Sequence, residues 1–103
     1  MKDTLMFIAH VTFTIAEKDR DLAIETLTHE VESVRAMLGC IAFTPFLDAT
    51  NSQNVGVLHE WDSAEHFAAY IASDSFKGLG DVLRPISLGA PVSKRFDATL
   101  LDT

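Results

Sequence analysis

The hydrophobic residues of this chain change their spacing near residue 15, and this change limits the folds available to it. Before that point every second residue is apolar: Leu5, Phe7, Ala9, Val11, Phe13 and Ile15 would share one face of a strand, and the residues between them would form a mixed face. Such alternation predicts a strand with other structure against both faces. Beyond it, apolar residues follow steps of three and four, at Ile24, Leu27, Val31, Val34 and Leu38. That spacing predicts an amphipathic helix with one buried stripe.

The remaining elements can be placed in chain order. Residues 40–47 and 55–61 are expected to be strands joined by a polar turn, and Pro45 predicts a sheet edge or a bulge. A helix over 64–72 follows, with Asp62 or Ser63 as its cap. A weaker helical turn over 74–85 and a last strand over 91–101 complete the chain.

The order strand, helix, strand, strand, helix, strand is the ferredoxin-like βαββαβ arrangement of the α+β class. The length suits a single domain over residues 1–103. Both helices would cover one face of an antiparallel sheet, and its other, partly apolar face would be bare in a monomer. Contiguous apolar surface normally meets a partner, so we expect a homodimer through this sheet face.

Composition excludes several kinds of partner. The chain has 8 Lys+Arg against 15 Asp+Glu, a formal net charge of −7, whereas nucleic acid and anionic membranes attract cationic surfaces. Cys40 is the only cysteine, which suits a reducing compartment. The longest apolar run is too short to cross a bilayer. We therefore expect a cytoplasmic protein with no nucleic-acid or membrane partner.

The histidines do not form a metal-binding pattern. Their positions, 10, 29, 59 and 66, lack the short spacings of zinc sites, and no metal is predicted. His29 and His66 are expected to be solvated, His10 to lie in the dimer interface, and Cys40 to be a small buried side chain. The sequence also lacks a glycine-rich phosphate loop after a strand and a nucleophile-elbow motif.

The stretch VLHEWDSAEHFAAY, residues 57–70, concentrates the side chains that could form a site. By strand parity His59 and Trp61 point the same way, and Phe67 and Tyr70 return over them from the next helix. Trp and Tyr offer flat apolar walls with one polar atom each. An imidazole could take a phenolic proton or orient a carbonyl. The same residues could instead form the closed end of a core, with His59 bonded to a neighbour.

These residues resemble the antibiotic biosynthesis monooxygenase (ABM) domain family of the dimeric α+β barrel superfamily. The resemblance extends over nearly the whole chain. It is carried by Ala9, by Gly39 and Cys40 followed by Phe43, and by HEWDSAEHFAAYIASDSF from His59 to Phe76. It implies a ferredoxin-like homodimer with a pocket between sheet and helices. The activities it implies are cofactor-independent oxidation of quinol-like aromatics and, in one branch, haem breakdown.

The sequence departs from the family pattern at several positions. His59 stands where the family commonly has Glu, which here has moved to Glu60, and Tyr70 stands where a His is common. The Asn, Trp and haem-ligating His of the haem-degrading branch correspond to Val11, Tyr70 and Gly80. These replacements disfavour haem breakdown.

We therefore expect a monooxygenase that needs no cofactor and binds a small planar aromatic or quinol between Trp61 and Tyr70. The predicted substrate-binding residues are Val11, Trp61, Phe67, Tyr70 and Phe76, and His59 is the candidate catalytic base. An ionised, electron-rich phenol can react with dioxygen itself, so binding, orientation and one base could suffice. Two alternatives are a non-enzymatic or isomerase-like dimeric module that binds a small metabolite, and a structural dimer with a filled pocket.

Overall fold

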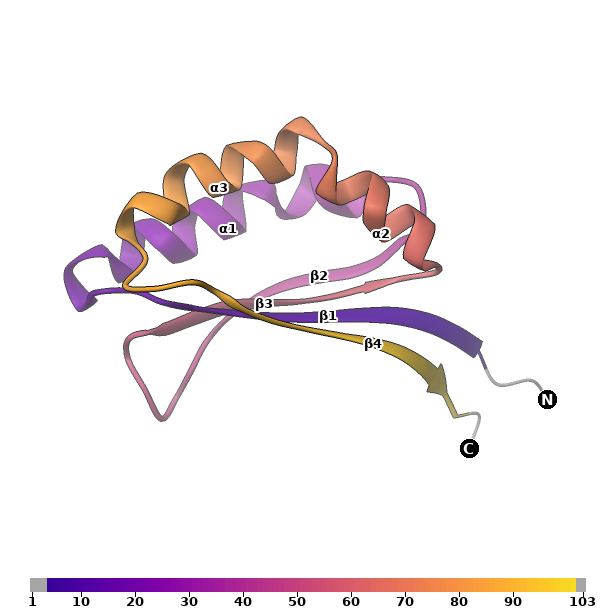
Figure 1. Cartoon of the computed structure of the whole chain (residues 1–103), viewed down its shortest axis with the longest axis horizontal. Helices are drawn as coiled ribbons and strands as arrows, with labels where there is room; N and C mark the ends of the chain where they lie inside the picture. Colours follow the sequence, from indigo (N-terminus) through magenta and orange to yellow (C-terminus); the bar gives the residue numbers. More distant parts are fainter. Residues whose placement is uncertain (1–3, 102–103) are drawn as a thin grey trace.

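A computed structural model describes residues 4–101, and residues 1–3 and 102–103 of the predicted domain lie outside the described residues. The strands β1 (Thr4–Thr14), β2 (Cys40–Leu47), β3 (Asn54–Trp61) and β4 (Val92–Leu100) form one sheet in the order β2-β3-β1-β4. All neighbouring strands are antiparallel. The helices α1 (Arg20–Arg35), α2 (Ala64–Ile71) and α3 (Asp74–Ile86) cover one face of it (Figure 1). This arrangement confirms the predicted α+β, ferredoxin-like fold.

The central strand β1 determines which side chains share a row across the sheet. Ala9 pairs with His59 of β3 on one side and with Arg95 of β4 on the other. Phe43 of β2 pairs in turn with His59. Directly paired residues of antiparallel strands lie on the same face. Since Ala9, Phe43 and His59 are all buried, this row faces the helices and brings the Arg95 side chain to the same side.

The core lies between the sheet and the helices. The side of β3 predicted from parity is buried along its length, at Val55, Val57, His59 and Trp61. Facing it are buried side chains from all three helices: Ala23, Leu27, Val34, Phe67, Tyr70, Leu79 and Leu83. The predicted strand faces are therefore confirmed where helices cover them.

Side-chain caps fix where two of the helices begin. Ser63 Oγ accepts a hydrogen bond from the backbone N–H of His66, and Ser73 Oγ accepts one from that of Phe76, both at 3.2 Å. Such bonds satisfy N–H groups that have no partner in the first helical turn. Before β2, Gly39 has φ 85°, a left-handed conformation that glycine adopts readily.

Three local predictions were wrong. Helix α1 ends at Arg35, so Leu38 lies outside it and is 79% exposed. The weaker helical turn over 74–85 is a full helix that runs to Ile86, because Ser73 caps its start and Leu79 and Leu83 are buried against the core; Pro85 stands one residue before its end. Cys40 is only partly buried, because it starts a strand at the sheet edge. As Pro45 predicted, β2 is an edge strand, with an irregularity between Cys40 and Ala42.

The other face of the sheet carries no helix among the described residues (Figure 1). A shallow hollow on it is lined by Ile8, His10, Thr44, Phe46, Leu58 and Phe96. The predicted homodimer would use this face, and it stays a prediction. Within residues 4–101 no helix is long and apolar enough to span a membrane. The cytoplasmic location also stays a prediction.

Candidate functional site

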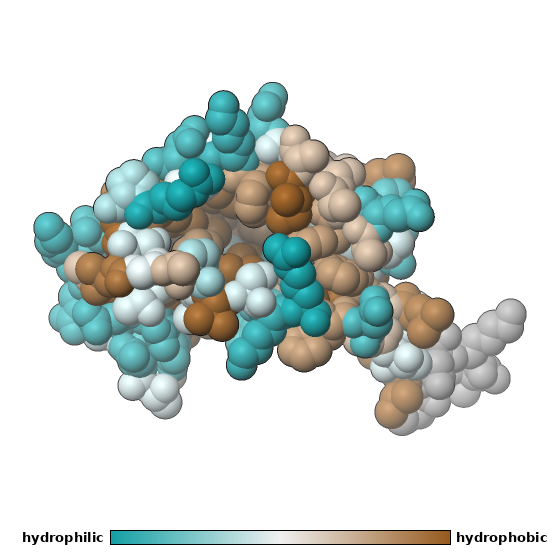
Figure 2. All heavy atoms as spheres, viewed as in Figure 1, coloured by the Kyte–Doolittle hydropathy of each residue, from teal (hydrophilic) through white to brown (hydrophobic). Residues whose placement is uncertain are grey.

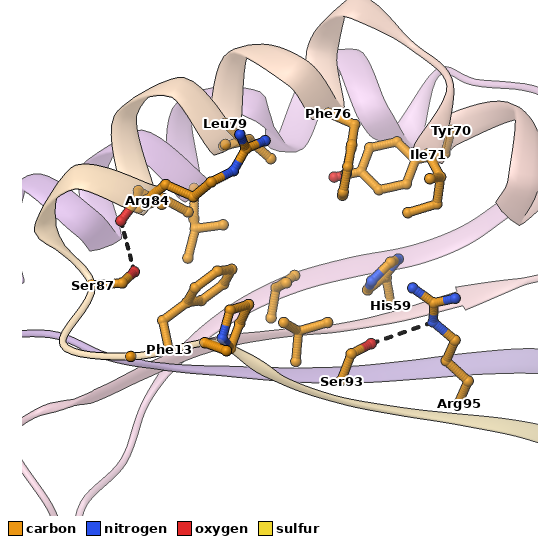
Figure 3. Close-up of a pocket in the computed structure, with 18 residues that line it drawn as sticks. Phe13, His59, Tyr70, Ile71, Phe76, Leu79, Arg84, Ser87, Ser93 and Arg95 are labelled. Carbon is orange, nitrogen blue, oxygen red and sulfur yellow. Dashed lines mark hydrogen bonds between the residues drawn. The ribbon is translucent and has the colours of Figure 1, made fainter.

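A cavity of about 410 Å³ separates the sheet from the helices (Figure 3). Its floor comes from β1, β3 and β4, and its roof from α1, the end of α2 and α3. Apolar side chains dominate both surfaces: Val11, Phe13, Leu27, Val57, Ile71, Phe76, Leu79 and Leu83. Enclosed apolar space with a few polar groups is typical of small-molecule sites.

The cavity opens between α3 and the edge strand β4. The exposed part of its lining comes from the C-terminal end of α3, residues 89–91 and the start of β4. Seen from this side, the surface is hollowed between the helix layer and the sheet layer (Figure 2). Hydrophobic side chains line the hollow and hydrophilic ones stand at its rim. A ligand can therefore enter without passing through the core.

His59 lines the cavity and is held from behind by Trp61. The indole Nε1–H of Trp61 donates a hydrogen bond to Nδ1 of His59 at 2.8 Å. In the neutral imidazole that accepts this bond, the proton is on Nε2. Nε2 has no hydrogen-bond acceptor among the described residues, so its N–H is available to a molecule in the cavity.

The surroundings of His59 keep its ring neutral. Burial, together with the positive charge of Arg95, lowers the pKa of His59 from 6.5 to about 4. A base with that pKa accepts protons poorly near neutral pH. The hydrogen bond and the low pKa together favour the second role considered for His59, orientation of a substrate oxygen, over proton abstraction.

Tyr70 closes the same end of the cavity from α2. Its ring stacks on Trp61, with ring centroids 5.4 Å apart and planes at 25°. The hydroxyl points into the cavity past Phe76 (Figure 3) and makes no hydrogen bond to another described residue. Burial first, then the charge of Glu30, raises the pKa of Tyr70, so the phenol stays protonated. It can therefore donate a hydrogen bond as well as accept one.

Two arginines complete the polar lining. The guanidinium of Arg95 lies over the Phe67 ring, 4.9 Å from its centroid, and its Nε is 3.4 Å from Ser93 Oγ. Arg84 of α3 folds back over Gly80, one turn earlier, and both line the cavity. Sequence analysis missed both arginines. Strand parity does place the Arg95 side chain on the other face of its strand from Val92 and Phe96. That this face adjoins His59 follows only from the pairing of β4 with β1.

Of the predicted site residues, Val11, His59, Tyr70 and Phe76 line the cavity. Trp61 and Phe67 lie one layer behind, packed against His59 and Tyr70. The predicted position of the ligand between Trp61 and Tyr70 is wrong, because these two rings are in direct stacking contact. The open space lies on the other side of Tyr70.

The other predicted polar residues are scattered. His66 Nδ1 pairs with Asp62 at 2.5 Å beside the start of α2. His29 is exposed on α1, and His10 lies on the uncovered sheet face, 5.4 Å from Phe46 between ring centroids. In the part of the chain that the structure describes, no three His, Cys, Asp or Glu residues converge as a metal site would require. Gly80, at the place of the haem-ligating His, offers no ligand atom.

Comparisons with known proteins identify the family and agree with the fold. The family model described as "Antibiotic biosynthesis monooxygenase" (ABM) matches residues 6–79, well over half of the chain. That range begins in β1 and ends within α3. A comparison with curated protein sequences found no significant match.

Solved structures show the same fold at low sequence identity. A candidate antibiotic biosynthesis monooxygenase from Nitrosomonas europaea is 10% identical, with a TM-score of 0.86 over 95% of this chain and 93% of that one. A conserved protein from Methanosarcina mazei Go1 is 16% identical, with a TM-score of 0.85 over 90% and 92%. A structure described as an antibiotic biosynthesis monooxygenase is 20% identical, with a TM-score of 0.79 over 92% and 98%.

Proposed function

This chain belongs to the antibiotic biosynthesis monooxygenase family, and we propose that it oxidises a small aromatic or quinol-type molecule without a cofactor. The substrate would lie in the cavity between the sheet and α3. One observation supports this most: the His59 Nε2–H and the Tyr70 hydroxyl, both without a partner among the described residues, meet in one apolar cavity. Buried polar groups normally have a partner, so this pair fits the oxygen of a bound molecule.

The reaction needs only the substrate and dioxygen. An ionised quinol gives electrons to dioxygen, and a new C–O bond forms at a ring carbon. The hydroperoxide that results loses water, so the product has gained one oxygen atom and lost two hydrogens. Holding the ring in a dry cavity removes competing orientations. The chain's own contribution is to bind, orient and exclude bulk water.

The hydrogen bonds give each polar residue a separate task. His59, kept neutral, donates from Nε2 to a phenolic or carbonyl oxygen, and Trp61 fixes the tautomer through Nδ1. Tyr70 donates to the same oxygen or to a second one, since its ring centroid lies 5.6 Å from that of His59. With a pKa of about 4, His59 does not retain the phenolic proton near neutral pH, so the proton passes to buffered bulk solvent through the cavity mouth.

The proposal is tested by oxygen uptake with a panel of hydroquinones and their fused-ring analogues. We expect uptake above the uncatalysed rate for at least one compound, with product carrying one added oxygen by mass spectrometry. Tyr70→Phe and His59→Gln should each lower kcat/KM by about tenfold to a hundredfold, since the first removes a donor to the developing negative charge and the amide N–H of the second cannot reproduce the position of the imidazole Nε2–H. His29→Gln, which replaces an exposed histidine on α1, is the matched control.

The alternative is a module that binds a small metabolite without oxidising it. The weak basicity of His59 favours this alternative, because the cavity then holds no effective base. A thermal-shift screen run beside the oxygen assay separates the two, since a ligand that prefers the native state raises the melting temperature. Binding with no uptake for any compound would favour the binding module and count against the monooxygenase.

A further inference from the structure

The charged groups that line the cavity are all cationic, although the chain as a whole is acidic. The chain carries a net charge of −7, yet the lining holds Arg84 and Arg95 and neither Asp nor Glu. Within residues 4–101 the one ion pair joins His66 to Asp62, so neither guanidinium has a carboxylate partner there. A guanidinium offers five N–H donors, and it binds carboxylates and other anionic oxygens in preference to neutral groups.

Nearby carboxylates do not neutralise these arginines. Asp97 follows Arg95 by two residues on the same strand face, and Asp81 lies near Arg84 on α3, but neither forms an ion pair. Glu30 accepts hydrogen bonds from Ser75 at 2.7 Å and from Ser33 at 3.1 Å, and it does not line the cavity. The mouth of the cavity therefore keeps a local positive charge.

Arg95 lies beside His59, with contacts to Phe67 and Ser93. The Phe67 ring lies under its guanidinium at 4.9 Å, and Ser93 Oγ is 3.4 Å from its Nε. Between Arg95 and His59 in the sheet stands Ala9, whose small side chain leaves room for both. The lowered pKa of His59, to which the Arg95 charge contributes, agrees with this closeness. The terminal nitrogens of Arg95 make no hydrogen bond to another described residue, so they can hold a ligand.

Arg84 reaches the same cavity from the helix layer. Its side chain folds back along α3 and covers Gly80, where a Cβ would lie 2.5 Å from Nη2. Figure 3 shows Arg84 running along α3 and Arg95 rising from β4, on the two sides of the open space. A molecule that enters from the α3–β4 side passes between two positive charges.

We infer that the cavity selects an aromatic molecule with an anionic oxygen group, which Arg95 binds beside His59 while Arg84 faces it across the mouth. This deepens the proposed function, on which it rests, by naming the class of substrate. A carboxylate on the ring and an ionised phenol share this chemistry. Charge-assisted hydrogen bonds are about twice as strong as neutral ones, so the charge decides which of two similar rings binds.

The test measures binding rather than turnover. Isothermal titration calorimetry at constant ionic strength compares 2-naphthoate with the neutral 2-naphthamide, and follows 2-naphthol from neutral pH to above its own pKa. We expect wild type to bind naphthoate about tenfold tighter than naphthamide, the scale of one charged hydrogen bond. Tightening of naphthol only above its pKa would identify an ionised phenol as the source of the charge instead.

Variants assign the preference to the arginines. Arg95→Gln should remove most of the preference for the anion while naphthamide binding stays close to wild type, and Arg95→Lys should keep part of it. Arg84→Gln should weaken anion binding less. Lys77→Gln, an equal loss of charge on α3 outside the cavity, should change neither affinity.

Several results would overturn the inference. The first is equal binding of naphthoate and naphthamide together with no tightening of naphthol above its pKa. The second is no binding of any probe. The third is a preference for the anion that survives in Arg95→Gln while the melting temperature of that variant stays normal. The outcome is independent of oxygen uptake. A chain that binds naphthoate through Arg95 but oxidises nothing would contradict the proposed monooxygenase and leave the anion site standing.

Discussion

His59 combines burial with an ionisable ring, and its surroundings decide which protonation state the fold tolerates. Only 2% of its surface is exposed, and four aromatic rings, those of Phe43, Trp61, Phe67 and Tyr70, lie within 6.2 Å of its own, centroid to centroid. The hydrogen bond from Trp61 requires Nδ1 to be without a proton. A proton added at Nδ1 would face the N–H donor of Trp61, and the charged ring would be buried beside the cationic Arg95.

This arrangement predicts a loss of stability in mild acid. The pKa of His59 is 6.5 unfolded and about 4 folded, so between these values the unfolded chain binds more protons. The stabilisation is complete above pH 6.5 and is lost as the pH falls towards 4, by about 3 kcal/mol. Urea unfolding at a series of pH values measures it. His59→Gln should flatten the curve in this window, because the lowered pKa values of Asp48 and Asp62 act only below 3.8.

Trp61→Phe tests the hydrogen bond that orients the imidazole. Phe keeps most of the buried surface but cannot donate to Nδ1, so we expect the pKa of His59 to rise and the free energy of unfolding to fall by about 1–3 kcal/mol. NMR titration of the His59 ring and chemical unfolding measure the two effects. Phe43→Leu removes an aromatic neighbour of His59 but keeps the bond. If both variants shift the pKa alike, packing rather than the bond sets it.

At the scale of the elements, a glycine in a strand and a glycine in a helix differ in the space available for a side chain. A Cβ on Gly56 of β3 would collide with the Phe46 ring and with the carbonyl oxygen of Val11 in the neighbouring strand. A Cβ on Gly78 of α3 would meet nothing within 4 Å. The first glycine therefore lets a ring lie flat on the sheet, whereas the second only weakens its helix.

Paired alanine substitutions follow from this difference. Gly56→Ala should lower the free energy of unfolding by about 1–3 kcal/mol, since the Val11 backbone cannot move aside without disturbing the sheet. Gly78→Ala should raise it by up to about 1 kcal/mol, because Ala is the better helix former. Urea unfolding of both variants beside wild type measures the changes. Equal effects of the same sign would contradict the contacts described for Gly56.

The helices and strands that show a regular spacing of hydrophobic residues could be predicted from the sequence. Strand parity predicted the buried side of β3, with His59 and Trp61 together, because covered strands show their environment in every second residue. The arginines of the site could not be predicted this way. Arg95 lies on an exposed edge strand, and its nearness to His59 depends on the register with Ala9, which no local pattern encodes. The stacking of Trp61 on Tyr70 likewise depends on how α2 packs.

At the scale of the whole molecule, the two faces of the sheet differ sharply. Helices cover one face, while the other presents apolar side chains to solvent, including Leu58 at 39% and Phe96 at 48% exposure. Phe96 pairs with Ile8 and Leu58 with His10, so these side chains adjoin across three strands. We propose that two chains associate through this face, since a continuous apolar surface of this kind normally meets a partner. Such a dimer is isologous, with the same residues contributed by both chains.

The dimer is tested by placing charge in the middle of that face. Leu58→Glu and Phe96→Glu would each bring two carboxylates into a self-complementary contact, so sedimentation equilibrium should show dimers for wild type at micromolar concentration and monomers for both variants. Leu38→Glu is the control, because Leu38 is 79% exposed in the turn before β2 and lies outside the sheet. A monomeric wild type would refute the proposal, as would dimers that persist in both sheet variants. Since the cavity opens on the helix side of β4, loss of the dimer should leave naphthoate binding unchanged.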